Sequence, residues 1–145
     1  MLGVDWGRKR FGVAVSDPGR LIAQPLATLT RRERQRPPIA ALLDLIQANE
    51  VVEIVVGLPL SPEGDEGEAA REARSFGDAL AARAHLPVTF WDERLSTALA
   101  IRSARAAGVS DRDSRGRLDQ MAAVAILQHF LDARGSGGAG GRGSE

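Results

Sequence analysis

The first part of the chain alternates apolar and polar residues in short runs. Residues 2–6 and 11–16 have the period-two pattern of strands, and only the short turn 7–10 separates them. This spacing predicts an antiparallel hairpin. Residues 21–29 predict a third strand, so three antiparallel strands are expected to open the fold.

The next part of the chain changes to the period of a helix. Pro37 and Pro38 can begin a helix, and the apolar residues after them keep helical spacing to about Asn49 (Ile39, Leu42, Leu43 and Ile46). Residues 51–56 are then a short β-branched run. Such a run is typical of a strand in parallel sheet that is covered by helices on both faces.

The rest of the chain adds one strand and three helices. Helical spacing after the loop 61–67 (Ala69, Ala73, Phe76, Leu80 and Ala84) and a strand over 87–91 predict a right-handed β-α-β unit. Ser96 can cap a helix that ends at Gly108, a polar stretch 109–116 follows, and a last helix is expected over 117–133. The fold class is therefore α/β, with a mixed five-stranded sheet, three antiparallel strands and then two parallel ones, flanked by helices.

Composition narrows the class of protein. With 145 residues the chain has enough length for one domain, expected over 1–134, and the Gly- and Ser-rich residues 135–145 are expected to be a disordered tail. There is no cysteine, which excludes disulfides, thiolate zinc sites and cysteine nucleophiles. No signal peptide and no apolar run of about 20 residues is recognisable. A soluble, cytoplasmic protein with no membrane association is expected.

Carboxylates stand where an α/β sheet builds its sites. Asp5 ends the first strand, Asp92 and Glu93 end a later one, and Asp119 begins the last helix. Alternation puts Asp5 on a face of small residues, and helical spacing puts Asp119 on the inward face of its helix. Asp92 and Glu93 point to opposite sides, so at most one of them is expected to face Asp5.

These carboxylates predict a metal site. Three hard oxygen ligands without His or Cys favour Mg²⁺ or Mn²⁺. Two such ions can activate water and stabilise the leaving oxygen of a phosphodiester, which would make the protein a two-metal nuclease. The simpler alternatives are that the small residues allow close packing of a helix and that Asp119 interacts favourably with the helix dipole.

Basic residues gather in three loops although the net charge is zero (Arg8, Lys9, Arg10; Arg31, Arg32, Arg34, Arg36; Arg112, Arg115, Arg117). Basic loops around an acidic site suit a polyanionic substrate, and solvated surface is the alternative. His85 and His129 are expected to have surface or core roles. Trp6 and Trp91 are expected to pack in the core, although an exposed Trp edge could stack a base.

Four ordered motifs resemble the YqgF family, also called RuvX. They are residues 5–17 (DWGRKRFGVAVSD), 56–60 (VGLPL), 92–97 (DERLST) and 119–123 (DQMAA). The resemblance covers the chain except the tail. It implies a ribonuclease H-like fold, a catalytic and metal-binding triad of Asp5, Glu93 and Asp119, and 5′-end maturation of 16S ribosomal RNA. Asp92, next to Glu93 at the strand end, is the alternative metal ligand.

The resemblance also leaves alternatives. Some members of the family are reported to act on branched DNA, so the nucleic-acid partner is expected to be pre-rRNA or branched DNA, and the protein a monomer or a homodimer. Ser61 to Asp65 depart from the family's usual loop sequence. We expect Arg10, Arg94, Arg115 and Arg117 to contact the nucleic-acid backbone, a structural salt bridge being the alternative for Arg94. The other functional hypotheses are a noncatalytic nucleic-acid-binding module and an actin-like kinase or ATPase, although the latter proteins need two such domains and this chain has residues for one.

Overall fold

The computed structural model describes residues 1–7, 9–31, 37–108 and 112–141. For residues 102, 105–108, 112, 113 and 136–141 it describes the backbone only. Arg8, Arg32, Arg34 and Arg36, which belong to the basic loops of the sequence, lie outside the described residues, as do the last four residues of the predicted tail.

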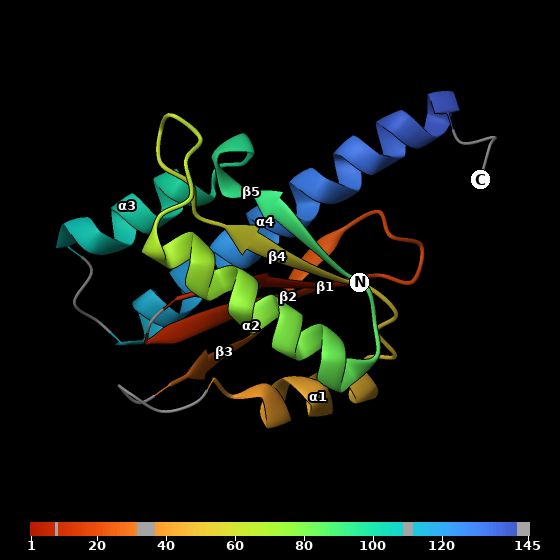
Figure 1. Cartoon of the computed structure of the whole chain (residues 1–145), viewed down its shortest axis with the longest axis horizontal. Coiled ribbons are helices and arrows are strands. Elements are labelled where there is room, and N and C mark those ends of the chain that lie inside the picture. Colours follow the sequence, from red (N-terminus) through yellow and green to blue (C-terminus); the bar gives the residue numbers. More distant parts are fainter. Residues whose placement is uncertain (8, 32–36, 109–111, 142–145) are drawn as a thin grey trace.

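A five-stranded mixed sheet forms the centre of the molecule (Figure 1). The strands are β1 (Leu2–Asp5), β2 (Arg10–Ser16), β3 (Ala23–Thr30), β4 (Ile54–Leu58) and β5 (Val88–Asp92), in the order β3-β2-β1-β4-β5. The first three strands are antiparallel, and β4 pairs parallel to β1 and β5 parallel to β4. The expected mixed sheet is confirmed, and β1 lies at its centre.

Helices cover both faces of the sheet (Figure 1). The bounds are α1 (Ile39–Ala48) and α2 (Glu68–Ala84) on one face, and α3 (Ala98–Gly108) and α4 (Arg112–Gly141) on the other, with a 3₁₀ turn η1 (Glu93–Leu95) after β5. Within the described residues, no helix is long and apolar enough to span a membrane.

The two faces of β1 and β2 carry different side chains, as the alternation predicted. Leu2, Val4, Trp6, Phe11 and Val13 belong to the core under α1 and α2, where the rings of Trp6, Phe11 and Phe76 lie 4.8–5.2 Å apart. On the opposite face, a Cβ at Gly3 would come within 2.8 Å of Leu127 on α4. The small residues therefore let α4 approach the sheet closely.

The structure differs from the sequence prediction at the last helix. The polar stretch 109–116 was expected to be a loop with the helix starting at Arg117, but α4 begins at Arg112. Residues 112–116 contain no proline, so the helix continues back through them, tied to β3 where Thr28 Oγ1 donates to the carbonyl of Gly116 (2.8 Å). Asp119 thus lies within α4 and not in its first turn.

The same helix continues to Gly141 at its other end, beyond the expected end near residue 133. This glycine-rich extension projects away from the sheet (Figure 1). Glycine lowers helix stability by about 1 kcal/mol per residue relative to alanine, and no sheet supports this extension. Disorder of residues 135–145 in solution stays a prediction.

Candidate active site

Asp5 lies at the carboxyl end of the central strand and is only 4% exposed. It pairs with Gly12 of β2 on one side. On the other side Val4 pairs with Val56, which brings Asp5 beside Gly57 of β4. Since neither neighbour has a side chain, the carboxylate stands in a gap that only other elements can fill.

Asp119 of α4 fills the gap above Gly12. A Cβ at Gly12 would fall 1.8 Å from the backbone oxygen of Asp119, so strand and helix touch through their main chains. The Asp119 side chain is almost fully buried, and Arg10 Nε donates a hydrogen bond to its Oδ2 at 2.7 Å. The inward direction predicted for Asp119 is therefore observed, with Arg10 as an ionic partner.

Glu93 approaches the same sheet edge from above Gly57. It is the first residue of η1 and is completely buried, and its Oε2 lies 3.5 Å from the position that a Gly57 Cβ would occupy. Asp5, Glu93 and Asp119 are the buried acidic residues among those described. They come from three segments to one edge of the sheet, near Gly12 and Gly57 on the two strands that flank β1.

These carboxylates match a hard divalent cation in donor chemistry but are not grouped around a single point. Within the described part of the chain, no three His, Cys, Asp or Glu side chains are close enough together to hold one ion. Asp119 faces Arg10 instead, which balances one buried negative charge.

Asp92 points elsewhere and has a structural role. It accepts hydrogen bonds from the backbone and the guanidinium of Arg94 at 2.7–3.1 Å. Arg94 also donates to the carbonyls of Ser61 (3.3 Å) and Pro62 (2.9 Å). Arg94 thus fastens the 61–67 loop to the end of β5, which is the salt-bridge alternative that the sequence left open.

The contacts of Arg94 give the stability an acid dependence. The hydrogen bonds from Arg94 hold the pKa of Asp92 below its ordinary value of 3.8, so ionised Asp92 stabilises the fold above that pH, and the effect is lost as pH falls through the lower folded pKa. We expect Arg94→Gln to lower Tm at neutral pH and the difference from wild type to narrow below about pH 4. Thermal unfolding followed by circular dichroism from neutral to acidic pH measures this.

Part of the Tm difference between Arg94→Gln and wild type is expected to remain at low pH, because the hydrogen bonds from Arg94 to the carbonyls of Ser61 and Pro62 do not titrate. Arg71→Gln is the matched control, since Arg71 is exposed on α2 and its side chain has no ion pair or hydrogen bond within the described residues. A difference between Arg94→Gln and wild type that stays constant with pH would show that Asp92 is not the relevant partner.

The other predicted cationic residues lie on the first turns of α4. Arg117 is exposed, and Arg115 is half-buried, with an Nε that is buried and has no hydrogen-bond acceptor among the described residues. Both precede Asp119 on the same helix. A phosphate oxygen near this end of α4 would satisfy the open donor of Arg115.

The pairing of Arg10 with Asp119 was not anticipated, although the sequence held a signal for it. Alternation in β2 puts Arg10 on the same face as Gly12, the face that α4 covers. The histidines have the modest roles expected. His129 Nδ1 accepts a hydrogen bond from Trp91 Nε1 (3.1 Å), and exposed His85 ends α2 in the left-handed region with φ of 57°.

Solved structures with this arrangement of elements confirm the fold. The chain superposes on Thermus thermophilus RuvC in complex with a Holliday junction substrate with a TM-score of 0.56 and 17% identity, covering 93% of this chain and 94% of RuvC. A second Thermus thermophilus RuvC structure gives a TM-score of 0.55 at 18% identity, with 94% and 97% covered. RuvC has a ribonuclease H-like fold, so the fold class expected from the sequence is confirmed.

Sequence relatives are much closer. Proteins named "Putative pre-16S rRNA nuclease" match at 47% identity in Frankia casuarinae, 48% in Mycobacterium ulcerans and 46% in Anaeromyxobacter dehalogenans, each over 92% of this chain. The matches span 66%, 78% and 96% of those proteins. A family model described as "RuvX: Holliday junction resolvase" matches residues 1–133. The chain therefore belongs to the RuvX family.

Proposed function

We propose that this protein is a metal-dependent nuclease that hydrolyses phosphodiester bonds in the maturation of the 5′ end of pre-16S rRNA. The observation that carries the proposal is that three buried carboxylates, from β1, η1 and α4, lie at one edge of the sheet near Gly12 and Gly57. Burying acids is costly unless a counter-charge compensates them, and a purely structural role does not explain three at one edge. The names of the closely similar relatives supply the substrate.

The fold holds the three carboxylates at the place where a metal ion would act. Asp5, Glu93 and Asp119 would hold Mg²⁺ or Mn²⁺, which when bound would activate water and stabilise the leaving oxygen. The backbone contact between Gly12 and Asp119 fixes the height of α4 above Asp5. Burial of all three side chains excludes bulk water and strengthens their interaction with a cation. Asp92 is a structural neighbour because Arg94 occupies it.

The arginines provide the contacts to substrate. Arg10 forms an ion pair with Asp119, and its half-buried side chain would contact a phosphate of the substrate where Asp119 holds the metal. Arg115 and Arg117 add donors at the start of α4, where a guanidinium can bind phosphate through two hydrogen bonds. Arg94 contributes indirectly by holding the 61–67 loop beside β5. A single domain acting in the cytoplasm is sufficient for this reaction.

Resolution of a Holliday junction is the second candidate, favoured by the description of the family. The same chemistry would serve, but a symmetric junction needs two active sites related by a two-fold axis. The resolvase hypothesis therefore requires a homodimer, whereas trimming of one RNA end can be done by a monomer.

Cleavage of matched substrates tests the proposal. A labelled RNA that carries the 5′ leader of 16S rRNA and a four-way DNA junction are incubated with Mg²⁺, Mn²⁺ or a chelator, with wild type and with Glu93→Gln. We expect metal-dependent cutting of the RNA by wild type and none by the variant. Paired symmetric cuts in the junction alone would establish the resolvase instead. Binding without cleavage of either substrate would favour the noncatalytic module.

A further inference from the structure

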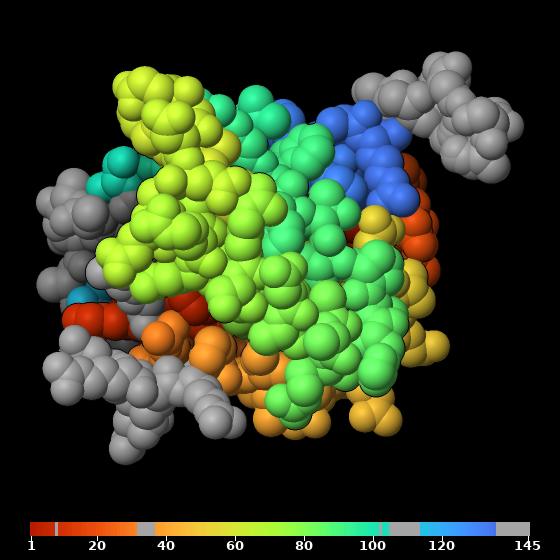
Figure 2. Space-filling model, in the orientation of Figure 1, coloured from red at the N-terminus to blue at the C-terminus, as the bar shows by residue number. Residues whose placement is uncertain are grey.

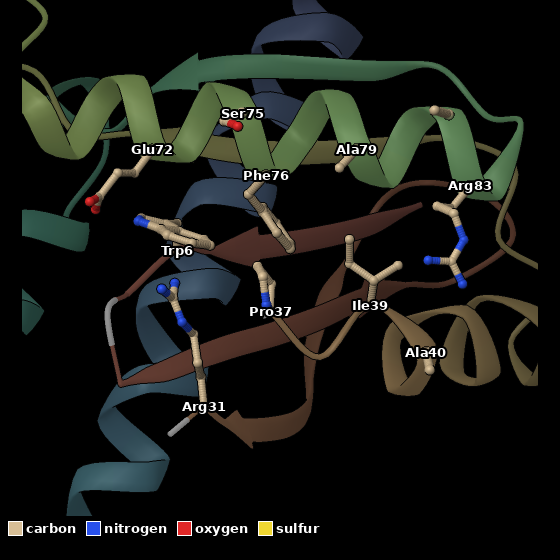
Figure 3. A pocket seen from close by; sticks show the side chains of 11 residues that line it. Trp6, Arg31, Pro37, Ile39, Ala40, Glu72, Ser75, Phe76, Ala79 and Arg83 are labelled. Atoms are coloured by element: carbon tan, nitrogen blue, oxygen red, sulfur yellow. The ribbon is translucent and has the colours of Figure 1, made fainter. Parts of the chain in front are cut away.

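A cavity of about 740 Å³ lies on the face of the sheet opposite the carboxylates (Figure 3). Its apolar lining comes from Trp6 after β1, from Ile39 of α1, and from Phe76 and Ala79 of α2. In Figure 2 atoms of the N-terminal strands show between α2 and the orange region of β3 and α1. The volume lies in the range of small-molecule and nucleotide sites.

Charged side chains stand at both ends of this cavity. Arg31 lies over the ring of Trp6, 5.4 Å from its centroid, and Arg83 lines the other end beside Ile39 (Figure 3). Glu72 lies on the far side of Trp6 from Arg31 in this view. A ligand with a flat apolar ring and an anionic group would match this arrangement, with its anion on the Arg31 side, away from the carboxylate of Glu72.

The guanidinium of Arg31 has an open donor. Its backbone N–H bonds to the carbonyl of Lys9 (2.8 Å), but its Nε is buried and no residue in the described ranges accepts a hydrogen bond from it. Arg31 also makes no ion pair within 4.0 Å among these residues. A buried donor without an acceptor is unfavourable, and a phosphate oxygen would supply the missing acceptor.

The Arg31 end of the cavity and the carboxylate site share one edge of the sheet. β3 runs parallel to β1, because each is antiparallel to β2. Arg31, which follows β3, and Asp5, which ends β1, therefore lie at the same edge of the sheet. Trp6 follows Asp5 directly and points to the opposite face. A strand crossing this edge could therefore present a phosphodiester to Asp5 and a neighbouring nucleotide to the cavity.

We infer that the cavity binds one unpaired nucleotide of the substrate strand next to the bond that is cut, with its base against Trp6 and Phe76 and its phosphate on Arg31. This inference rests on the proposed nuclease function and specifies its substrate. A base that lies against Trp6 and Phe76 has left its stack and its complementary base, so the strand is single-stranded at this point. The substrate class is thus a single-stranded end and not a continuous duplex.

Binding without cleavage tests this inference. A fluorescent single-stranded RNA and the same RNA in a blunt duplex are titrated with protein in the presence of a chelator, and anisotropy gives Kd. We expect wild type to prefer the single strand, and Arg31→Gln and Ala79→Trp each to weaken its binding about tenfold. Ala79 is exposed on α2, so the larger side chain fills the cavity without disturbing the core.

Matched controls separate the cavity from general effects. Arg71→Gln removes the same charge from α2 outside the cavity, and Ala133→Trp adds the same ring to an exposed position of α4. Both are expected to bind like wild type. Equal Kd values for all variants would overturn the inference, as would a loss in Arg31→Gln no larger than in Arg71→Gln, or a duplex bound as tightly as the single strand.

Two further outcomes have separate meanings. Displacement of the RNA by an equal concentration of uridine or adenosine monophosphate would assign the cavity to a free nucleotide and overturn its role on the strand. In proteins that carry Asp5→Asn or Glu93→Gln, the Arg31→Gln substitution should still weaken binding of the single strand by the same factor. Loss of cleavage in those variants with normal binding in Arg31→Gln would retain the nuclease and reject the cavity.

Discussion

Asp5→Asn is expected to reduce cleavage of the RNA substrate by about a thousandfold or more, which corresponds to roughly 4 kcal/mol in the barrier. Asn has nearly the same shape as Asp, so the side chain still fits beside Gly12 and Gly57, but it lacks the negative charge that a divalent ion requires. Single-turnover cleavage with Mg²⁺ or Mn²⁺ measures the loss.

The fold of Asp5→Asn is expected to persist. Asn keeps the size of Asp and one oxygen acceptor at this buried position, so Tm should stay close to that of wild type. The matched control is Asp78→Asn, which changes an exposed acid of α2 and should cleave like wild type. A metal-dependent rate for Asp5→Asn within a fewfold of wild type would remove Asp5 from the chemistry.

Nucleic-acid binding by the same variant separates a nuclease from a binding module. A nuclease should bind its substrate equally or more tightly after loss of a carboxylate that repels phosphate. Weaker binding by Asp5→Asn, without any cleavage by wild type, would show that the acid serves recognition.

The arrangement of the acidic residues could be predicted largely from local patterns. Period two in β1 determines that Asp5 shares its face with Gly3 and opposes Trp6, and helical period places Asp119 in line with Ala123 and Ile126. These periods do not depend on distant residues. The inward directions of Asp5 and Asp119 were predicted for that reason and agree with the structure.

Features that depend on register between distant segments could not be predicted in the same way. The ion pair of Arg10 with Asp119 joins residues that are 109 positions apart, and it depends on the height of α4 above β2. The sequence left Arg94 with two alternatives, contact with nucleic acid or a structural salt bridge. Its hydrogen bonds to the carbonyls of Ser61 and Pro62, 33 and 32 residues away, depend on how distant segments pack. The predicted start of the last helix at Arg117 is wrong, since α4 begins at Arg112. The polar residues 112–116 have no apolar periodicity from which a helix could be predicted.

Gly12→Ala is expected to destabilise the protein by about 3 kcal/mol or more and to lower Tm by roughly 10 °C. The added Cβ would fall 1.8 Å from the backbone oxygen of Asp119, where no side-chain rotation can relieve the clash. Gly12 lies in a regular strand and its φ is not positive, so the backbone conformation suits alanine and the effect comes from the methyl group alone. Urea and thermal unfolding measure the loss.

The same substitution should disrupt the site before it unfolds the chain. Moving α4 away from β2 carries Asp119 away from Asp5, so cleavage should fall even at temperatures where Gly12→Ala remains folded. Gly67→Ala is the matched control, because a Cβ there would meet no atom within 4 Å. If Gly12→Ala unfolds at the same temperature as wild type and cleaves at the same rate, α4 can move away from the sheet freely. The main-chain contact would then not be what positions Asp119.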